Sequence, residues 1–403
     1  MRFIDRVAGG FFCLLLTGFH VLGKILPVRT PYVCSPGKIL LIKFPEMGAI
    51  VLAYPLMKYL QKEYPDAEIF FLTFASNKPL FSVLKTAVQE KNVLTIRDTS
   101  WRTICADTIR VICLFFHYRF DIVFDLDFFS RFSALLTYVT GAPKRVGFYR
   151  YGFEGLYRGE LLTHKVLYNP HEHISRMYLC LGMCSREKEK NSAEIRYNIS
   201  DTDICFPKYI PRVSGKAAAL GFLDFMGEKK DRIFFINPGE GVISVREWPL
   251  ENFISLARLL LHDPDACVIL IGTYGALPKA EAMLKLCDHE RLVNAVGRTS
   301  LEDMMELFCL GTALITNDCG AAHLAMLTPI KKFIFFGPET PEVFGQNREN
   351  TRVFYSRWPC SPCLSVLNHR VSVCRDNLCL KNISVEEVYN AIMKDCGIPV
   401  HSV

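Results

Sequence analysis

The stretch ILLIKFPEMGAIVLAYPLMKYL, residues 39–60, decides the fold class of this chain. Its first four residues form a continuous apolar run, which is typical of a strand buried on both faces of a sheet. A turn with Gly48 follows, and apolar residues then recur at helical spacing to about Tyr64, with Pro55 predicting a kink. The stretch therefore predicts a strand followed by a helix, which is the unit of an open α/β fold.

The same unit recurs along the chain. Further short apolar runs, each followed by a turn and a helical pattern, occupy residues 69–72, 122–124, 233–236, 268–271, 313–315 and 333–336. The pattern stops between residues 186 and 227, which begin with a charge run that predicts solvated surface. Two α/β domains with parallel sheets are therefore expected to face each other across a cleft. Their predicted boundaries are a hydrophobic N-terminal segment (1–31), a first domain (32–200), a linker (201–227), a second domain (228–385) and a C-terminal helix (386–403).

The composition agrees with folded domains. Half of the 403 residues are hydrophobic and 22% are charged, which excludes a disordered chain. A net charge of +6 is too small over this length to indicate nucleic-acid binding, but it suits an anionic membrane surface or substrate. Sixteen cysteines, many of them within apolar runs, favour a reducing compartment.

The N-terminus is the most hydrophobic part of the sequence. Residues 7–23 hold no Asp, Glu, Lys or Arg, and Arg2, Arg6 and Lys24 flank them. Seventeen such residues are at the short limit for a membrane-spanning helix, and several glycines weaken the pattern. Three interpretations stay open: a helix lying in the membrane interface, a single span, and a helix packed on the first domain.

Candidate functional residues come directly after the predicted strands, where open parallel sheets bind ligands. After the first strand, Glu46 precedes Gly48 and Ala49, and it is either a solvated loop residue or a carboxylate that faces the cleft. After residues 233–236 come Gly239, Gly241 and then Arg246. An arginine there can bind a phosphate bidentately or form a surface ion pair.

The stretch TNDCGAAHL, residues 316–324, follows a later strand. Its small residues Gly320, Ala321 and Ala322 open a helix, whose exposed N–H groups suit a pyrophosphate. Asp318 is either the N-cap of this helix or a ligand for a sugar hydroxyl, and Cys319 and His323 lie beside it.

Four cysteines near the C-terminus form a separate pattern. Cys360, Cys363, Cys374 and Cys379 lie within 20 residues. Such a group suits a structural zinc or an iron–sulfur cluster, but disulfides or unbonded thiols are alternatives.

These segments together resemble glycosyltransferase family 9, the heptosyltransferases of lipopolysaccharide core assembly. The matching segments are residues 39–60, GAPKRVGF (141–148), NPGEGVISVREWPLENF (237–253), GRTSL (297–301), TNDCGAAHL (316–324) and FGPETP (336–341). The resemblance implies a GT-B fold of two Rossmann-like domains, with the nucleotide sugar bound by the second domain and a C-terminal segment that returns to the first. It also implies inverting transfer from a nucleotide-diphosphate sugar to a lipid-linked glycan, without a catalytic metal.

Carried over residue by residue, the resemblance places a donor-binding basic residue at Arg246, the motif's acidic residue at Asp318 and its histidine at His323. A family glutamate matches Glu281. The family's catalytic aspartate falls on Ala49, which cannot take a proton. We therefore hypothesise that Glu46 supplies the base.

The sequence thus predicts an inverting glycosyltransferase at the cytoplasmic face of the inner membrane. One alternative is a catalytically silent homologue that binds a glycan or nucleotide sugar as an assembly or regulatory factor. A dinucleotide oxidoreductase is disfavoured, because no G-x-G-x-x-G follows the first strand.

Overall fold

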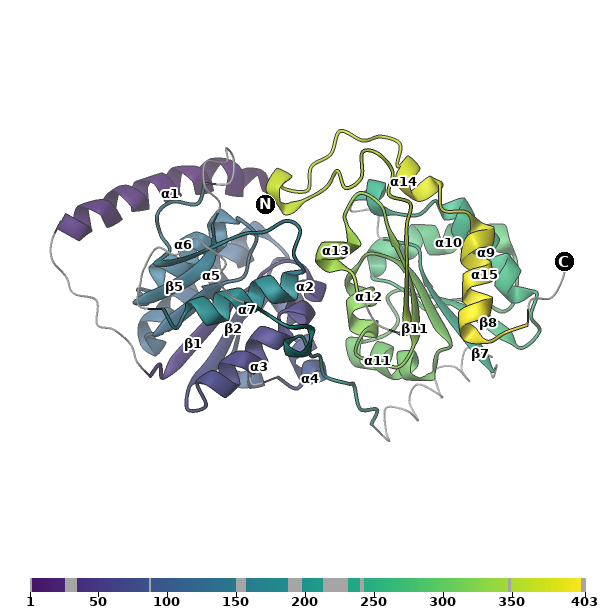
Figure 1. Ribbon diagram of the computed structural model, residues 1–403, viewed down its shortest axis with the longest axis horizontal. Coiled ribbons are helices and arrows are strands. Elements are labelled where there is room, and N and C mark those ends of the chain that lie inside the picture. Colours follow the sequence, from purple (N-terminus) through teal and green to yellow (C-terminus); the bar gives the residue numbers. More distant parts are fainter. Residues whose placement is uncertain are drawn as a thin grey trace. The chain divides into compact units, whose positions relative to one another are not determined.

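The structure, a computed structural model, describes residues 2–25, 35–86, 88–149, 157–187, 198–212, 231–239, 243–346 and 349–399. The chain divides into two compact units, Met1–Phe206 and Pro207–Val403. Each unit contains a six-stranded parallel sheet with helices around it (Figure 1). The predicted α/β class with two parallel sheets is therefore confirmed. The division falls within the predicted linker over residues 201–227.

The sheet of the first unit has the order β3-β2-β1-β4-β5-β6. Its strands are β1 (Lys38–Ile42), β2 (Glu68–Phe74), β3 (Val93–Ile96), β4 (Ile122–Asp125), β5 (Lys144–Tyr149) and β6 (His164–Leu167). Ile42 at the end of β1 pairs with Leu72 on one side and with Asp125 on the other. The strand order reverses between β1 and β4, which is where open α/β sheets bind ligands.

The helices of the first unit are α1 (Arg2–Ile25), α2 (Met47–Leu52), α3 (Tyr54–Glu63), α4 (Leu80–Leu84), α5 (Trp101–Tyr118), α6 (Arg131–Val139) and α7 (Ile174–Cys184). The kink expected at Pro55 is a break at Ala53 between α2 and α3, with Pro55 in the first turn of α3. Ile104 of α5 and Leu136 of α6 belong to one hydrophobic cluster with the sheet, so both helices cover the same face. Helix α1 packs on α6 (Figure 1).

The second unit repeats this arrangement with the order β12-β11-β10-β7-β8-β9. Its strands are β7 (Arg232–Asn237), β8 (Ala266–Leu270), β9 (Leu292–Asn294), β10 (Ala313–Asn317), β11 (Lys331–Phe336) and β12 (Thr351–Tyr355). The equivalent reversal lies between β7 and β10, where Asn237 pairs with Thr316.

The helices of the second unit are α9 (Leu250–Leu261), α10 (Leu277–Cys287), α11 (Leu301–Leu310), α12 (Gly320–Ala325), α13 (Pro341–Phe344), α14 (Leu378–Lys381) and α15 (Val385–Cys396). Helix α15, the C-terminal helix expected to return to the first domain, packs on α9 of its own unit. Its Val388 and Ile392 are fully buried in the core there.

Helix α1 is 24 residues long and is exposed along one side. Among the described residues, no helix combines the length and hydropathy needed to cross a membrane.

Candidate functional site

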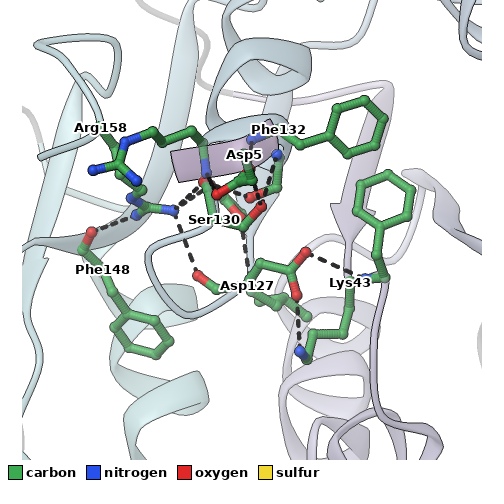
Figure 2. A network of polar contacts seen from close by, with 12 residues as sticks. Asp5, Lys43, Asp127, Ser130, Phe132, Phe148 and Arg158 are labelled. Atoms are coloured by element: carbon green, nitrogen blue, oxygen red, sulfur yellow. Dashed lines mark hydrogen bonds and ion pairs between the residues drawn. The ribbon is translucent and has the colours of Figure 1, made fainter. Parts of the chain in front are cut away.

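Lys43, directly after β1, is fully buried in an ion pair. Its Nζ lies 2.8 Å from Oδ1 of Asp127, which follows β4. The other oxygen of Asp127 accepts a hydrogen bond from the Phe44 N–H at 3.3 Å. Figure 2 shows Lys43 pointing at this carboxylate, which follows the neighbouring strand. The pair joins β1 to β4 at the point where the strand order reverses.

A second buried pair lies next to the first. Nη1 of Arg158 is 2.7 Å from Oδ2 of Asp125, and its Nη2 donates to the Phe148 carbonyl (Figure 2). Burial raises the pKa of Asp125 to about 6, although the Arg158 charge acts in the opposite direction. Asp125 in turn accepts the Asp127 N–H at 3.1 Å. The four side chains form one buried scaffold beneath the first loop.

The loop after β1 leaves Glu46 exposed and buries Ala49. Glu46 is exposed and has a φ of 68°, in the left-handed region that non-glycine residues rarely adopt. Gly48 and Ala49 are buried in the first turn of α2, where the Ala49 N–H donates to the Glu46 carbonyl at 2.9 Å. Of the residues predicted here, Glu46 thus offers an accessible carboxylate and Ala49 contributes packing.

In the second unit, Trp248 fixes the loop that carries Arg246. Its indole stacks on Phe335, and its Nε1 donates to the Ile383 carbonyl at 3.0 Å. Its backbone N–H donates to Asn317 at the end of β10, at 2.8 Å. Gly239 has a φ of 93°, and a Cβ there would lie 2.2 Å from a Glu247 oxygen, so glycine is required. Gly241 lies outside the described residues.

Arg246 lies at the centre of a buried charge cluster. Its Nη2 contacts Oδ2 of Asp318 at 2.5 Å and Oε2 of Glu339 at 3.2 Å. The other oxygen of Glu339 is 2.8 Å from Nε of Arg370. Burial raises the pKa of Glu339 to about 8, with Asp318 adding to the effect and Arg246 opposing it. Sequence analysis singled out Arg246 and Asp318 but missed Glu339 and Arg370.

The start of α12 lies beside this cluster. His323 is buried, with Nε2 3.7 Å from Oδ1 of Asp318, and burial lowers its pKa. Its Nδ1 has no hydrogen-bond partner in the described part of the chain. Cys319 contacts Thr316 at 3.1 Å, and burial raises the pKa of its thiol although the N–H groups of Ala322 and Ala321 oppose this. Gly320 leaves open space where a Cβ would lie.

The remaining predicted donor residue, Glu281, is exposed on α10. Its neighbour Lys279 forms an ion pair with Glu247.

The four C-terminal cysteines are free thiols that differ in burial, from exposed Cys360 to buried Cys379. Burial and the three neighbouring thiols raise the pKa of Cys379 to about 11. Each thiol has its own surroundings: Cys374 donates to the Asp376 carbonyl, and Cys379 lies against Gly337. Within the described ranges, no three His, Cys, Asp or Glu side chains form a group that could hold a metal ion. The zinc or iron–sulfur site expected from these cysteines is therefore not found among the described residues.

Chemically, the second unit offers two partly buried guanidinium groups and a histidine nitrogen without a hydrogen-bond partner among the described residues. Both features suit an anionic ligand with further hydrogen-bonding groups. The first unit offers an exposed carboxylate on a strained loop.

Comparison with known proteins gives a consistent result. The family profile described as "Glycosyltransferase family 9 (heptosyltransferase)" matches residues 115–371, which is more than half of the chain. Lipooligosaccharide heptosyltransferase 2 of Haemophilus influenzae is 29% identical over 108 residues, covering 26% of this chain and 31% of that protein. Lipopolysaccharide heptosyltransferase 2 of Salmonella typhimurium is 25% identical over 134 residues, which cover 32% of this chain and 38% of that protein. The chain thus spans less than half the length of these curated relatives.

Solved structures match over a longer range. The ADP-heptose lipopolysaccharide heptosyltransferase II of E. coli has a TM-score of 0.68 at 20% identity, covering 89% of this chain and 98% of that one. A family 9 glycosyltransferase from Veillonella parvula has a TM-score of 0.69 at 16% identity, covering 91% and 98%. At these identities the likeness shows the fold, and it agrees with the GT-B class expected from the sequence.

Proposed function

Because the chain belongs to glycosyltransferase family 9, we propose that it transfers a sugar from a nucleotide-diphosphate donor to a lipid-linked glycan. The relatives favour a heptose as the sugar and a lipopolysaccharide core as the acceptor. The observation that carries the proposal is the partly buried Arg246 at the strand reversal of the second unit, beside a histidine whose Nδ1 has no partner in the described chain.

Arg246 would bind the donor diphosphate. It is already held by Asp318 and Glu339, so its guanidinium is oriented before the donor arrives. The N–H groups at the start of α12 and the open space at Gly320 adjoin the same cluster. When the bond to the sugar breaks, negative charge grows on the leaving diphosphate, and Arg246 would offset it.

Glu46 would act as the base on the acceptor side. The acceptor hydroxyl oxygen attacks the anomeric carbon, the bond from that carbon to the diphosphate breaks, and the hydroxyl proton moves to the Glu46 carboxylate. Attack from the face opposite the leaving group inverts the anomeric centre. Backbone strain at an exposed loop residue is frequent at functional sites, which supports this role for Glu46.

The test is a turnover assay with purified protein, ADP-, UDP- and GDP-sugars and lipid-extract acceptors. We expect free nucleoside diphosphate to appear when the acceptor is present, and Glu46→Gln to lower the rate by about 10²–10⁴-fold. Glu90→Gln is the matched control, because Glu90 is an exposed glutamate of the same unit. Full activity of Glu46→Gln with an unchanged melting curve would exclude Glu46 as the base.

A second candidate function rests on Ala49. The position of the family's catalytic aspartate holds a buried methyl group, which is what a catalytically silent homologue would show. Such a protein would bind a nucleotide sugar or glycan as an assembly or regulatory factor. Donor binding without turnover across a broad set of acceptors would favour this function.

We also propose that the protein works at the cytoplasmic face of the inner membrane. A lipid-linked acceptor requires an enzyme that reaches the bilayer, and helix α1 exposes apolar side chains that suit this location.

A further inference from the structure

Helix α1 is fixed to the first unit along one side. Its Asp5 accepts hydrogen bonds from the backbone N–H groups of Phe132 at 2.8 Å and Arg131 at 3.3 Å, and so caps the start of α6. Cys13 is fully buried, and Thr17 Oγ1 accepts the Glu160 N–H at 3.0 Å. The orientation of α1 about its own axis is therefore set by the protein.

The opposite side of α1 is a continuous apolar surface. Its exposed side chains are 40–64% accessible: Phe11, Phe12, Leu14, Leu15, Phe19, Val21 and Leu22. An amphipathic helix in solution would normally bury such a side. Here the buried side holds Cys13, Thr17 and the Asp5 contacts, and the large apolar residues face outward.

Helix α5 has the same unusual outer side. Trp101, Ile109 and Phe116 are 58%, 64% and 65% accessible and recur at helical spacing. Helices α5 and α6 share the core cluster over one sheet face, and α1 packs on α6. Helix α1 is thus joined to the α5–α6 layer through α6, and α1 and α5 both expose apolar side chains.

The two acidic side chains of these three helices, Asp5 and Asp107, are both engaged in contacts with the rest of the unit. Asp5 caps α6, and Asp107 is buried against Arg97, with its two oxygens 2.8 and 3.0 Å from Nε and Nη2. Arg102 and Arg110 of α5 are exposed, and Arg110 also contacts Asp107 at 3.7 Å and the Thr95 carbonyl at 2.6 Å. A surface that combines large apolar side chains with cationic groups matches an anionic lipid interface.

We propose that the outer sides of α1 and α5 form a single surface that docks onto an anionic phospholipid bilayer, with both helices lying in the interface. This surface deepens the proposed function, because it would seat the first unit on the membrane that carries the acceptor. A second copy of the chain is a less suitable partner for this surface, because a two-fold contact would bring the same arginines of both copies together and their charges would repel.

The first experiment is flotation of the full-length protein with vesicles of phosphatidylcholine alone or with 30 mol% phosphatidylglycerol. We expect binding to the anionic vesicles, and about tenfold weaker partitioning for each large apolar side chain removed. The variants are Phe11→Gln/Phe19→Gln on α1 and Ile109→Gln/Phe116→Gln on α5. Leu286→Gln is the control, because Leu286 is an exposed helical leucine of the second unit and should leave partitioning unchanged.

The second experiment tests α5 directly through Trp101. The chain has three tryptophans, and the other two, Trp248 and Trp358, lie in the second unit. Brominated phosphatidylcholine in the anionic vesicles should quench part of the fluorescence, and Trp101→Phe should abolish that quenching. This readout reports contact between α5 and lipid whatever α1 does.

Three results would contradict the proposal that α1 and α5 form one membrane-docking surface. The first is flotation that survives the α5 variant together with absence of Trp101 quenching, which would leave α1 as an isolated anchor. The second is equal binding to neutral vesicles. The third is a dimer in sedimentation that the α5 variant dissociates, with no vesicle binding. Turnover on a detergent-dispersed acceptor is measured separately, so a failure of transfer and a failure of docking are distinguishable.

Discussion

Glu339 should make donor binding depend on pH. Burial raises the pKa of this carboxyl to about 8, so near neutral pH it is mostly protonated in the free protein. Its oxygen lies 3.2 Å from the Arg246 guanidinium that would hold the diphosphate. A phosphate oxygen on the same guanidinium would therefore lie within about 6 Å of Glu339, given an ionic hydrogen bond of about 2.8 Å.

The size of the effect follows from that separation. Two like charges about 6 Å apart repel by about 3 kcal/mol at an effective dielectric constant near 20. This energy corresponds to an upward pKa shift of about 2 units for Glu339 when the donor is bound. Protonated Glu339 is thus favoured in the complex, and binding takes up a proton above pH 8. Affinity should stay constant below pH 8 and fall by up to about tenfold per pH unit above it.

The assay is calorimetric titration between pH 7 and 9.5 with whichever of ADP, UDP and GDP binds most tightly. The terminal phosphate is already ionised throughout this range, because its second pKa is near 6. Glu339→Gln should flatten the profile, and Glu342→Gln, which changes an exposed glutamate three residues away, should leave it intact. A flat wild-type profile, or an unchanged slope in Glu339→Gln, would refute the reasoning.

Three further predictions concern the buried ion pair and the donor loop. Lys43→Met leaves the buried Asp127 charge unpaired and should destabilise the first unit by about 3–5 kcal/mol, seen as an earlier transition in scanning calorimetry; an unmoved transition would contradict this. Gly239→Ala should lower both stability and donor affinity, because the new Cβ meets Glu247, and melting curves with and without donor check it. Arg246→Ala should weaken nucleoside diphosphate binding at least tenfold while the isolated acceptor binds as before, and unchanged affinity would remove Arg246 from the donor site.

Much of the fold could be predicted because a strand buried on both faces of a sheet is a continuous apolar run in the sequence. The run at residues 233–236 became β7, and the run at 39–42 became β1, each within one residue. Strand β5 was missed, because it begins with Lys144 and Arg145. Both are buried in the sheet, where their side chains donate to the carbonyls of Ser185 and Leu161. A buried charged side chain that hydrogen-bonds to carbonyl groups far away in the sequence cannot be recognised from the hydrophobic pattern around it.

The site was predictable to the extent that its residues follow strands. Arg246 and Asp318 were found because each comes after a strand of the second unit, and the structure brings them together. Glu339 also follows a strand, but the sequence does not show that it contacts Arg370. That arginine comes from another loop, and only the folded unit brings the two side chains together. Lys43 and Asp127 are 84 residues apart, so only the assembled sheet shows that they are a pair.

The absence of an aspartate at position 49 forces a choice among the three carboxylates described near the end of β1. Asp125 and Asp127 are each buried against a cation, at 2.7 and 2.8 Å, and freeing either one would leave a buried charge unpaired at a cost of several kcal/mol. Glu46 is exposed, so an acceptor hydroxyl and solvent can reach its carboxylate. The two kinds of carboxylate should therefore separate in experiment: Asp127→Asn should lower the melting temperature, whereas Glu46→Gln should lower the rate and leave the melting temperature unchanged. If Asp127→Asn lowered the rate without lowering the melting temperature and Glu46→Gln left the rate unchanged, the base would be Asp127 instead of Glu46.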